Sequence, residues 1–110
     1  MKPMPKALLI HSAKLLEVST ENTWQSEETT EIATLENIRI EPLSRLVTAK
    51  DNTQVTLTAV LFYDCKNSRP SGVAFKQGQK VVFNGVEHIV ETIEPLYDGQ
   101  KLHHYELGLI

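Results

Sequence analysis

The side chains of this sequence best suited to hold a metal ion are four histidines and one cysteine, Cys65. Zinc sites commonly draw such ligands from short spacings, and the sequence contains no CxxC pair and no HxxxH pair. His103 and His104 are adjacent, and neighbouring residues of a β-strand point to opposite faces, so both can bind one ion only if the strand bulges. We therefore predict no metal site, with a half-buried His103 beside a surface His104.

Cys65 is also the candidate nucleophile. Asp64 and Lys66 flank it and could lower the pKa of its thiol, but no helix start and no positioned histidine is evident to activate it. Phosphate-binding strings of the GxGxxG or GxxxxGK type are absent from the sequence. We expect no catalytic residue, no cofactor and no enzyme activity, and we interpret Cys65 as a strand-end residue with an ordinary thiol. A hydrolase that uses Cys65 would be rejected if Cys65→Ser left all function intact.

The net charge of −3 conceals alternating blocks of charge, with residues 17–41 acidic and residues 43–80 basic. Opposite blocks on neighbouring copies would attract each other and favour head-to-tail assembly, whereas the alternative interpretation is a set of solvated loops. The basic residues that could also touch phosphate are Lys66, Arg69, Lys76 and Lys80. Their only interleaved aromatics are Phe75 and Phe83, so we do not expect sequence-specific nucleic-acid binding.

A length of 110 residues predicts a single domain, residues 1–110, with one modest core. No signal peptide and no apolar run long enough to cross a bilayer is visible, so we expect no membrane association. One cysteine cannot form an internal disulfide, which fits a reducing compartment.

The elements that must position these residues are clearest between Val73 and Ile110. Asn84-Gly85 and Asp98-Gly99 predict two tight turns, because both pairs tolerate the positive φ that two-residue hairpin turns require. Pro95 fits a strand edge, since it cannot donate a ladder hydrogen bond. The stretch therefore predicts a meander of three strands. In the last strand, the predicted core face carries His103, Tyr105, Leu107 and Leu109.

The first half of the chain is also predicted to be mainly extended. Ala7 to Val18 reads as a strand covered in part on both faces, with a helix over Lys6 to Glu17 as the competing interpretation. Thr29 to Pro42 reads as a strand with one face made of Ile32, Thr34, Glu36, Ile38 and Ile40, interrupted by an irregularity at Asn37. Leu43 to Gln54 is interpreted as a long flexible loop.

Val55 to Tyr63 is the clearest single strand, because β-branched and aromatic residues alternate along it. Residues 64–72 form an irregular connection, Gly78 is expected at positive φ, and Trp24 is a lid over the core or an interface anchor. Counting these segments gives an all-β fold, a small and mainly antiparallel barrel or sandwich of six to seven strands with long loops.

Four stretches resemble the minor capsid proteins of tailed bacteriophages and prophages, of the head-completion or head-tail connector type. They are PKALLIH from Pro5, NIRIEP from Asn37, LFYDCKNSRP from Leu61 and EPLYDGQKLHHYE from Glu94. The resemblance covers nearly the whole chain. It implies a virion structural protein, made in the bacterial host cytoplasm, that assembles into a homo-oligomeric ring beneath the portal at the head-tail neck.

Such a ring closes the DNA-filled head, offers a platform for the tail, and contacts portal or adaptor proteins, tail proteins and, non-specifically, packaged DNA. By position, the resemblance makes Leu43 to Gln54 the candidate channel loop, with Arg45 and Lys50 facing DNA. The candidate assembly interface consists of Trp24, Lys66, Arg69, Lys76 and Lys80. The alternative function is a small β-barrel binding module for nucleic acid or peptide, which would retain affinity for a free ligand.

Overall fold

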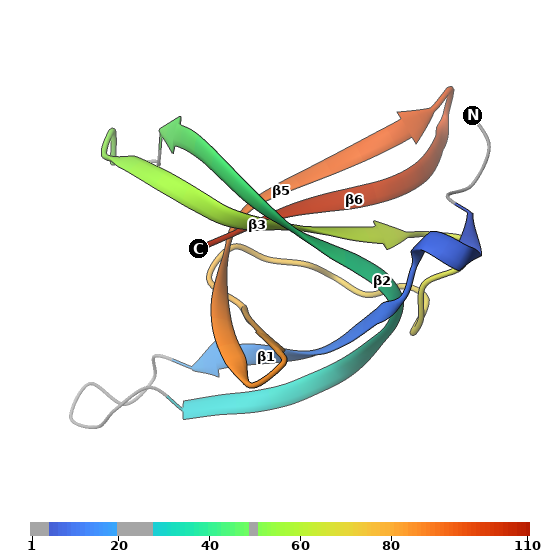
Figure 1. Cartoon of the computed structure of the whole chain (residues 1–110), viewed down its shortest axis with the longest axis horizontal. Coiled ribbons are helices and arrows are strands. Elements are labelled where there is room, and N and C mark those ends of the chain that lie inside the picture. Colours follow the sequence, from blue (N-terminus) through green and yellow to red (C-terminus); the bar gives the residue numbers. More distant parts are fainter. Residues whose placement is uncertain (1–4, 20–27, 49–50) are drawn as a thin grey trace.

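The computed structural model describes residues 5–19, 28–48 and 51–110, and within them six strands close into an antiparallel barrel (Figure 1). A single 3-10 turn, η1 (Lys6–Leu8), precedes β1 (His11–Ser19). The remaining strands are β2 (Glu28–Thr48), β3 (Gln54–Asp64), β4 (Lys80–Phe83), β5 (Val86–Asp98) and β6 (Lys101–Leu109). The order around the barrel is β1-β2-β3-β6-β5-β4, and β4 returns to β1 to close it. This confirms the all-β fold class.

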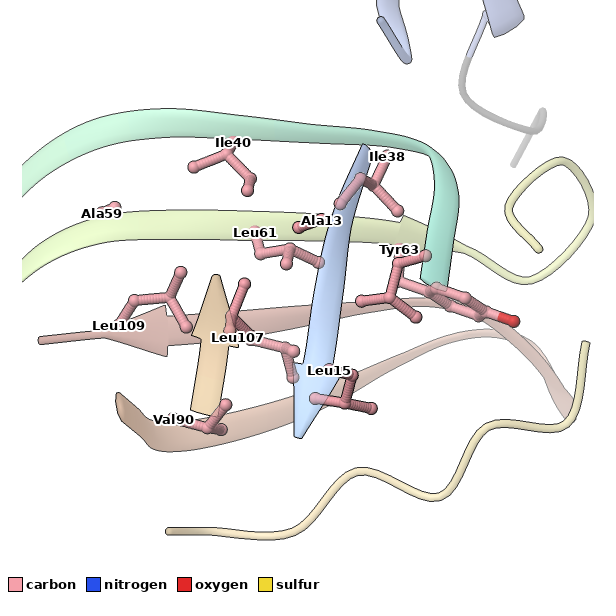
Figure 2. Close-up of a cluster of buried hydrophobic side chains, with 12 residues drawn as sticks. Ala13, Leu15, Ile38, Ile40, Ala59, Leu61, Tyr63, Val90, Leu107 and Leu109 are labelled. Atoms are coloured by element: carbon pink, nitrogen blue, oxygen red, sulfur yellow. The ribbon is translucent and has the colours of Figure 1, made fainter. Parts of the chain in front are cut away.

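The barrel interior is apolar. Alternate residues of each strand point inward, as the two-residue strand period requires, and Leu15, Leu61, Val90, Leu107 and Leu109 meet there (Figure 2). All five side chains are completely shielded from solvent. The predicted inward positions of Leu107 and Leu109 are therefore correct.

Both predicted turns of the C-terminal meander exist. Asn84 and Gly85 have φ of 52° and 76° and join β4 to β5 in two residues. In the second hairpin Asp98 pairs with Lys101, so the turn residues are Gly99 and Gln100 rather than the predicted Asp98-Gly99. Gly99 supplies the positive φ of 64° that the turn needs.

The start of the chain differs from the prediction at its outer face. The strand begins at His11 rather than Ala7, and Leu8 and Ile10 are exposed, so this segment is not covered on both sides. The competing helix is also wrong, because β1 pairs with β2 on one edge and with β4 on the other. On the other face, Leu9, Ala13 and Leu15 are buried.

β2 is much longer than predicted, and its pattern reverses at Asn37. This residue has φ of 55° at a register shift, so Leu35 points inward before it and Ile38 points inward after it. The predicted face that joined Ile32 to Ile38 is therefore wrong, because a bulge adds one residue and restarts the alternation. Ile32 is exposed.

Strand β2 also runs through Pro42 to Thr48, so Leu43 to Gln54 is not a long loop. The Ile40 N–H points away from β3 to His11 Nδ1, and the strand period puts the Pro42 nitrogen on that same side. No described strand pairs with this side of β2 beyond Ile38. Pro42 has no N–H to donate, and at this position its absence costs no hydrogen bond between strands.

Among the described residues no helix has the length and apolar character needed to cross a membrane.

Candidate functional site

A rigid turn, Asp64 to Pro70, covers the end of the barrel where β3 stops. Asp64 and Ser68 are buried there. The Asp64 N–H donates to Ser68 Oγ over 2.9 Å, and the Ser68 N–H donates back to the Asp64 carbonyl over 2.8 Å. Asn67 Nδ2 donates to Asp64 Oδ2 over 2.8 Å, so the Asp64 carboxylate stabilises the conformation of the turn.

This turn is fastened to the bulge of β2. Ser68 Oγ donates to the Asn37 carbonyl over 2.5 Å, and Asn37 Nδ2 donates to the Asn67 carbonyl over 3.2 Å. Glu36 and Arg69 exchange two backbone hydrogen bonds of 2.8 and 3.0 Å. The stretch that begins at Asn37 and the stretch that begins at Leu61, two of the four that carry the resemblance, are therefore joined by hydrogen bonds, although about 30 residues separate the bonded residues.

The N-terminal stretch joins the same end of the barrel. The Ile40 N–H donates to His11 Nδ1 over 3.0 Å, and Arg39 Nη1 donates to the Leu8 carbonyl over 3.1 Å. Arg39 Nε also pairs with Glu41 Oε1 at 2.5 Å. Together Leu8, Leu9 and Phe62 line a mostly apolar surface hollow of about 330 Å³ next to this ion pair.

The fourth stretch that carries the resemblance begins at Glu94, in the β5–β6 hairpin, and contacts the same end of the barrel. The Cys65 N–H donates to the His103 carbonyl over 3.1 Å. Behind it the rings of Tyr63, Phe75 and Tyr105 pack edge to face or tilted, with centroids 5.2 to 6.2 Å apart. The Tyr63 hydroxyl donates to the Pro70 carbonyl, and burial, with Cys65 adding to it, raises the pKa of this hydroxyl.

His103 and His104 lie differently from the prediction, because β6 bulges between them. Leu96 pairs with His104 and Tyr97 with Leu102, which leaves His103 as the extra residue. The bulge brings the two Nδ1 atoms to 2.7 Å, and His104 Nε2 donates to Glu106 Oε2 over 3.0 Å. His104 is the buried member, 8% exposed, so the predicted surface position is wrong.

Cys65 is half-buried, and its surroundings do not activate it. Burial raises the pKa of the thiol, and the Asp64 carboxylate raises it further. The suggestion that its neighbours lower this pKa is therefore wrong, because burial of the thiol and the negative charge of Asp64 both disfavour the thiolate. Among the described residues, no three His, Cys, Asp or Glu side chains are grouped to hold a metal ion.

The residues selected for assembly or DNA contact separate into different places. Lys66 and Arg69 are exposed on the Asp64 to Pro70 turn, and Lys76 is exposed further along the same connection. Lys80 is 16% exposed and pairs with Glu87 Oε1 at 2.8 Å, so it ties β4 to β5. Trp24 and Lys50 lie outside the described residues. Arg45 belongs to strand β2 and pairs with Leu57, so it is not in a loop.

The β2–β3 and β5–β6 hairpins extend beyond the barrel toward opposite sides of the view in Figure 1, and the molecule measures 47 × 29 × 27 Å along its principal axes. In the outer part of the β2–β3 hairpin, Arg45 to Thr48 pair with β3 alone, and Leu46 is 59% exposed. In the β5–β6 hairpin, the part of β5 beyond Val90 pairs with β6 alone, and Tyr97 is 56% exposed. Such edges and apolar side chains are open to contacts with another chain.

A groove between these hairpins was missed by the sequence interpretation. Adjacent strands place Arg39, Phe62, Glu106 and Glu94 in one outward row across β2, β3, β6 and β5. The next row holds Glu41, Val60, Gly108 and Thr92. The hollow over these rows has a volume of about 190 Å³ and is also lined by Leu43, Arg45 and Leu57. The two-residue period of each strand identifies which residues point outward. Which of these residues line up across neighbouring strands depends on strand register.

Comparison with known proteins gives one match. Residues 5–109 match the model of a family described as minor capsid protein. No curated protein and no solved structure matches the chain.

Proposed function

The chain belongs to the minor capsid protein family, and on that premise we propose that it is a head-completion or head-tail connector subunit. Membership of this family makes the protein a structural component of a phage virion. In our proposal, copies form a ring beneath the portal at the neck. The ring closes the DNA-filled head and provides the platform to which the tail attaches.

The observation that carries this proposal is the pair of hairpins that extend beyond the barrel toward opposite sides of the view in Figure 1. A closed barrel has no free edges, but these extensions restore them and expose Leu46 and Tyr97. Contacts between unlike surfaces of successive copies generate a ring when the rotation closes. Two different projections on one rigid body supply such unlike surfaces.

Within that ring, we assign the β2–β3 hairpin to the side that faces the DNA channel. Its exposed Arg45 is a cation on a projecting element, and contact with phosphate needs no base recognition. Many copies around a ring would each need little affinity. The tip of the β5–β6 hairpin, with its exposed Tyr97, remains available for portal, adaptor and tail proteins.

Removal of the gene tests the proposed function. We expect filled heads that leak DNA or lack tails, counted by electron microscopy and by sensitivity of the packaged DNA to nuclease. Wild-type protein supplied in trans is the control and should restore tailed, nuclease-resistant particles. Normal infectious particles without the protein would contradict the connector role. Cryo-electron microscopy of the particle neck would then locate the subunit directly.

The alternative, a small β-barrel binding module, predicts affinity of the purified chain for a free nucleic acid or peptide. Among the described aromatic side chains Tyr97 alone is exposed, so the described surface offers no row of rings on which bases could stack. A titration with single-stranded oligonucleotides at physiological salt separates the two functions, because a connector subunit should show only weak, salt-sensitive binding.

A further inference from the structure

The groove on the outer face of the barrel contains an unfavourable pair of charges. Glu94 and Glu106 are direct cross-strand partners on β5 and β6. Like charges at such positions repel each other, because their side chains lie side by side on one face of the sheet. Glu106 Oε2 accepts a hydrogen bond from His104, and Glu94 is exposed. A cation placed between the two carboxylates would relieve the repulsion.

The groove is shaped to accept a side chain rather than a segment. Gly108 lies between Val60 and Thr92 with Leu57 and Thr92 packed close over it, and these residues line the hollow of about 190 Å³ together with Phe62, Glu94 and Glu106. The floor is apolar, formed by the half-buried Val60 and Phe62. An apolar stem lying over this floor with a charged end at the carboxylates is the arrangement that a lysine adopts.

The Asp64 to Pro70 turn provides a convex surface of opposite charge. Lys66 and Arg69 are exposed on it, and the bonds of Asp64, Asn67 and Ser68 fix its backbone. Arg69 Nη1 donates to the carbonyls of Lys66 and Ser68, both over 2.8 Å, which folds this side chain back onto its own turn. Lys66 is therefore the cation of the turn that is better placed to reach another molecule.

We propose that the Lys66 to Arg69 turn of one copy docks in this groove of the next copy, with the Lys66 ammonium between Glu94 and Glu106. The inference rests on the proposed ring, because it names the contact between neighbouring subunits. The turn covers the end of the barrel and the groove lies on its side wall, so the contact joins unlike surfaces. Such a contact repeats around a ring and does not stop at a dimer.

Charge exchange tests the contact. In particles complemented with variants of the protein, Lys66→Glu and Glu94→Lys should each lower incorporation about tenfold or more, because each places like charges together. Combining both substitutions should restore incorporation, since the attraction is then rebuilt with its signs reversed. Lys6→Glu and Glu31→Lys are the matched controls, as both change exposed residues outside the two surfaces. These controls should assemble like the wild type.

A melting curve separates assembly from folding. Glu94→Lys replaces the repulsion with Glu106 by an attraction, so its melting temperature should be equal to or above that of the wild type while its incorporation falls. A variant that loses incorporation together with its melting temperature would overturn the docking contact and assign Glu94 a role in folding. Failure of the double substitution to restore incorporation would overturn it as well.

Cross-linking identifies the neighbour. Particles grown with a mixture of light and 15N-labelled protein, treated with a carbodiimide, should yield a Lys66 amide to Glu94 or Glu106 that joins one light and one heavy peptide. Its absence, with the protein located at the neck, would reject this contact and leave the ring intact. Absence of the protein from the neck would instead reject the proposed function.

Discussion

Gly108 is the position in the barrel where a side chain has no space. A Cβ atom there would lie 2.7 Å from Leu57 Cδ1 and closer still to Thr92 Oγ1. We expect Gly108→Ala to reduce the free energy of unfolding by about 1–3 kcal/mol, the usual penalty for overpacking. Urea denaturation measures the change. Thr92→Ala in the same chain should recover part of it, and an unchanged midpoint for Gly108→Ala would contradict the packing of β5 on β6.

Cys65 gives a pH-dependent readout of the end of the barrel. Burial raises the pKa of its thiol, and Asp64 adds to the rise, so the folded protein keeps the proton to higher pH than the unfolded chain. Above the ordinary thiol pKa the unfolded state loses that proton first, and stability falls as the pH rises further. Alkylation with iodoacetamide should be slow at neutral pH and accelerate on unfolding in urea. Equal rates for both states would contradict the buried environment.

At the scale of elements, the Asp64 to Pro70 turn and the β2 bulge act as one unit. Ser68→Ala removes the acceptor of the buried Asp64 N–H and the donor to the Asn37 carbonyl. Each group left without a partner costs about 1–3 kcal/mol. Denaturation and hydrogen exchange at the Asp64 amide measure the loss, and Ser71→Ala, at an exposed position on the same connection, is the control. Unchanged protection of that amide would show that the turn holds without Ser68.

The two hairpin turns depend on glycine. Gly85 and Gly99 have φ of 76° and 64°, where a β-branched residue is strained. We expect Gly85→Val and Gly99→Val each to cost more than about 1 kcal/mol, read as a lower melting temperature. Gly85→Asn should cost less, because asparagine tolerates this region. A melting temperature unaffected by valine would count against the turn geometry.

At the scale of the whole molecule, the last strand joins β3 to β5 in the barrel wall. Leu109 is completely buried and pairs with both Ala59 and Val90, while Ile110 exchanges two hydrogen bonds of 3.0 Å with Ile89. Deleting Leu109 and Ile110 should therefore destabilise the fold by about 2–5 kcal/mol, the range for loss of a buried leucine side chain. Deleting Ile110 alone should cost less. Full stability of the shorter chain would mean that β6 is not needed for closure.

The sequence was informative where structure is local. Asn84-Gly85 and Gly78 were correctly placed at positive φ, because few residues tolerate that region. The alternation from Val55 to Tyr63 correctly predicted a strand, since a strand without bulges keeps its two-residue period. It failed at Asn37, where a bulge adds one residue and moves each following side chain to the other face. It also failed at His104, which is buried although a surface position was predicted.

The sequence by itself determined the all-β class, the turn between β4 and β5 and the inward positions of Leu107 and Leu109, since these follow from backbone sterics and local periodicity. Tertiary structure decided what residues far apart in the chain do together. It allowed β2 to continue past Pro42, because the Pro42 nitrogen lies on the unpaired side of the strand. It also joined the Asp64 to Pro70 turn to Asn37 and aligned Phe62, Glu106 and Glu94 in one row. Strand register sets these contacts, and register is a property of pairs of strands, which a single segment does not specify.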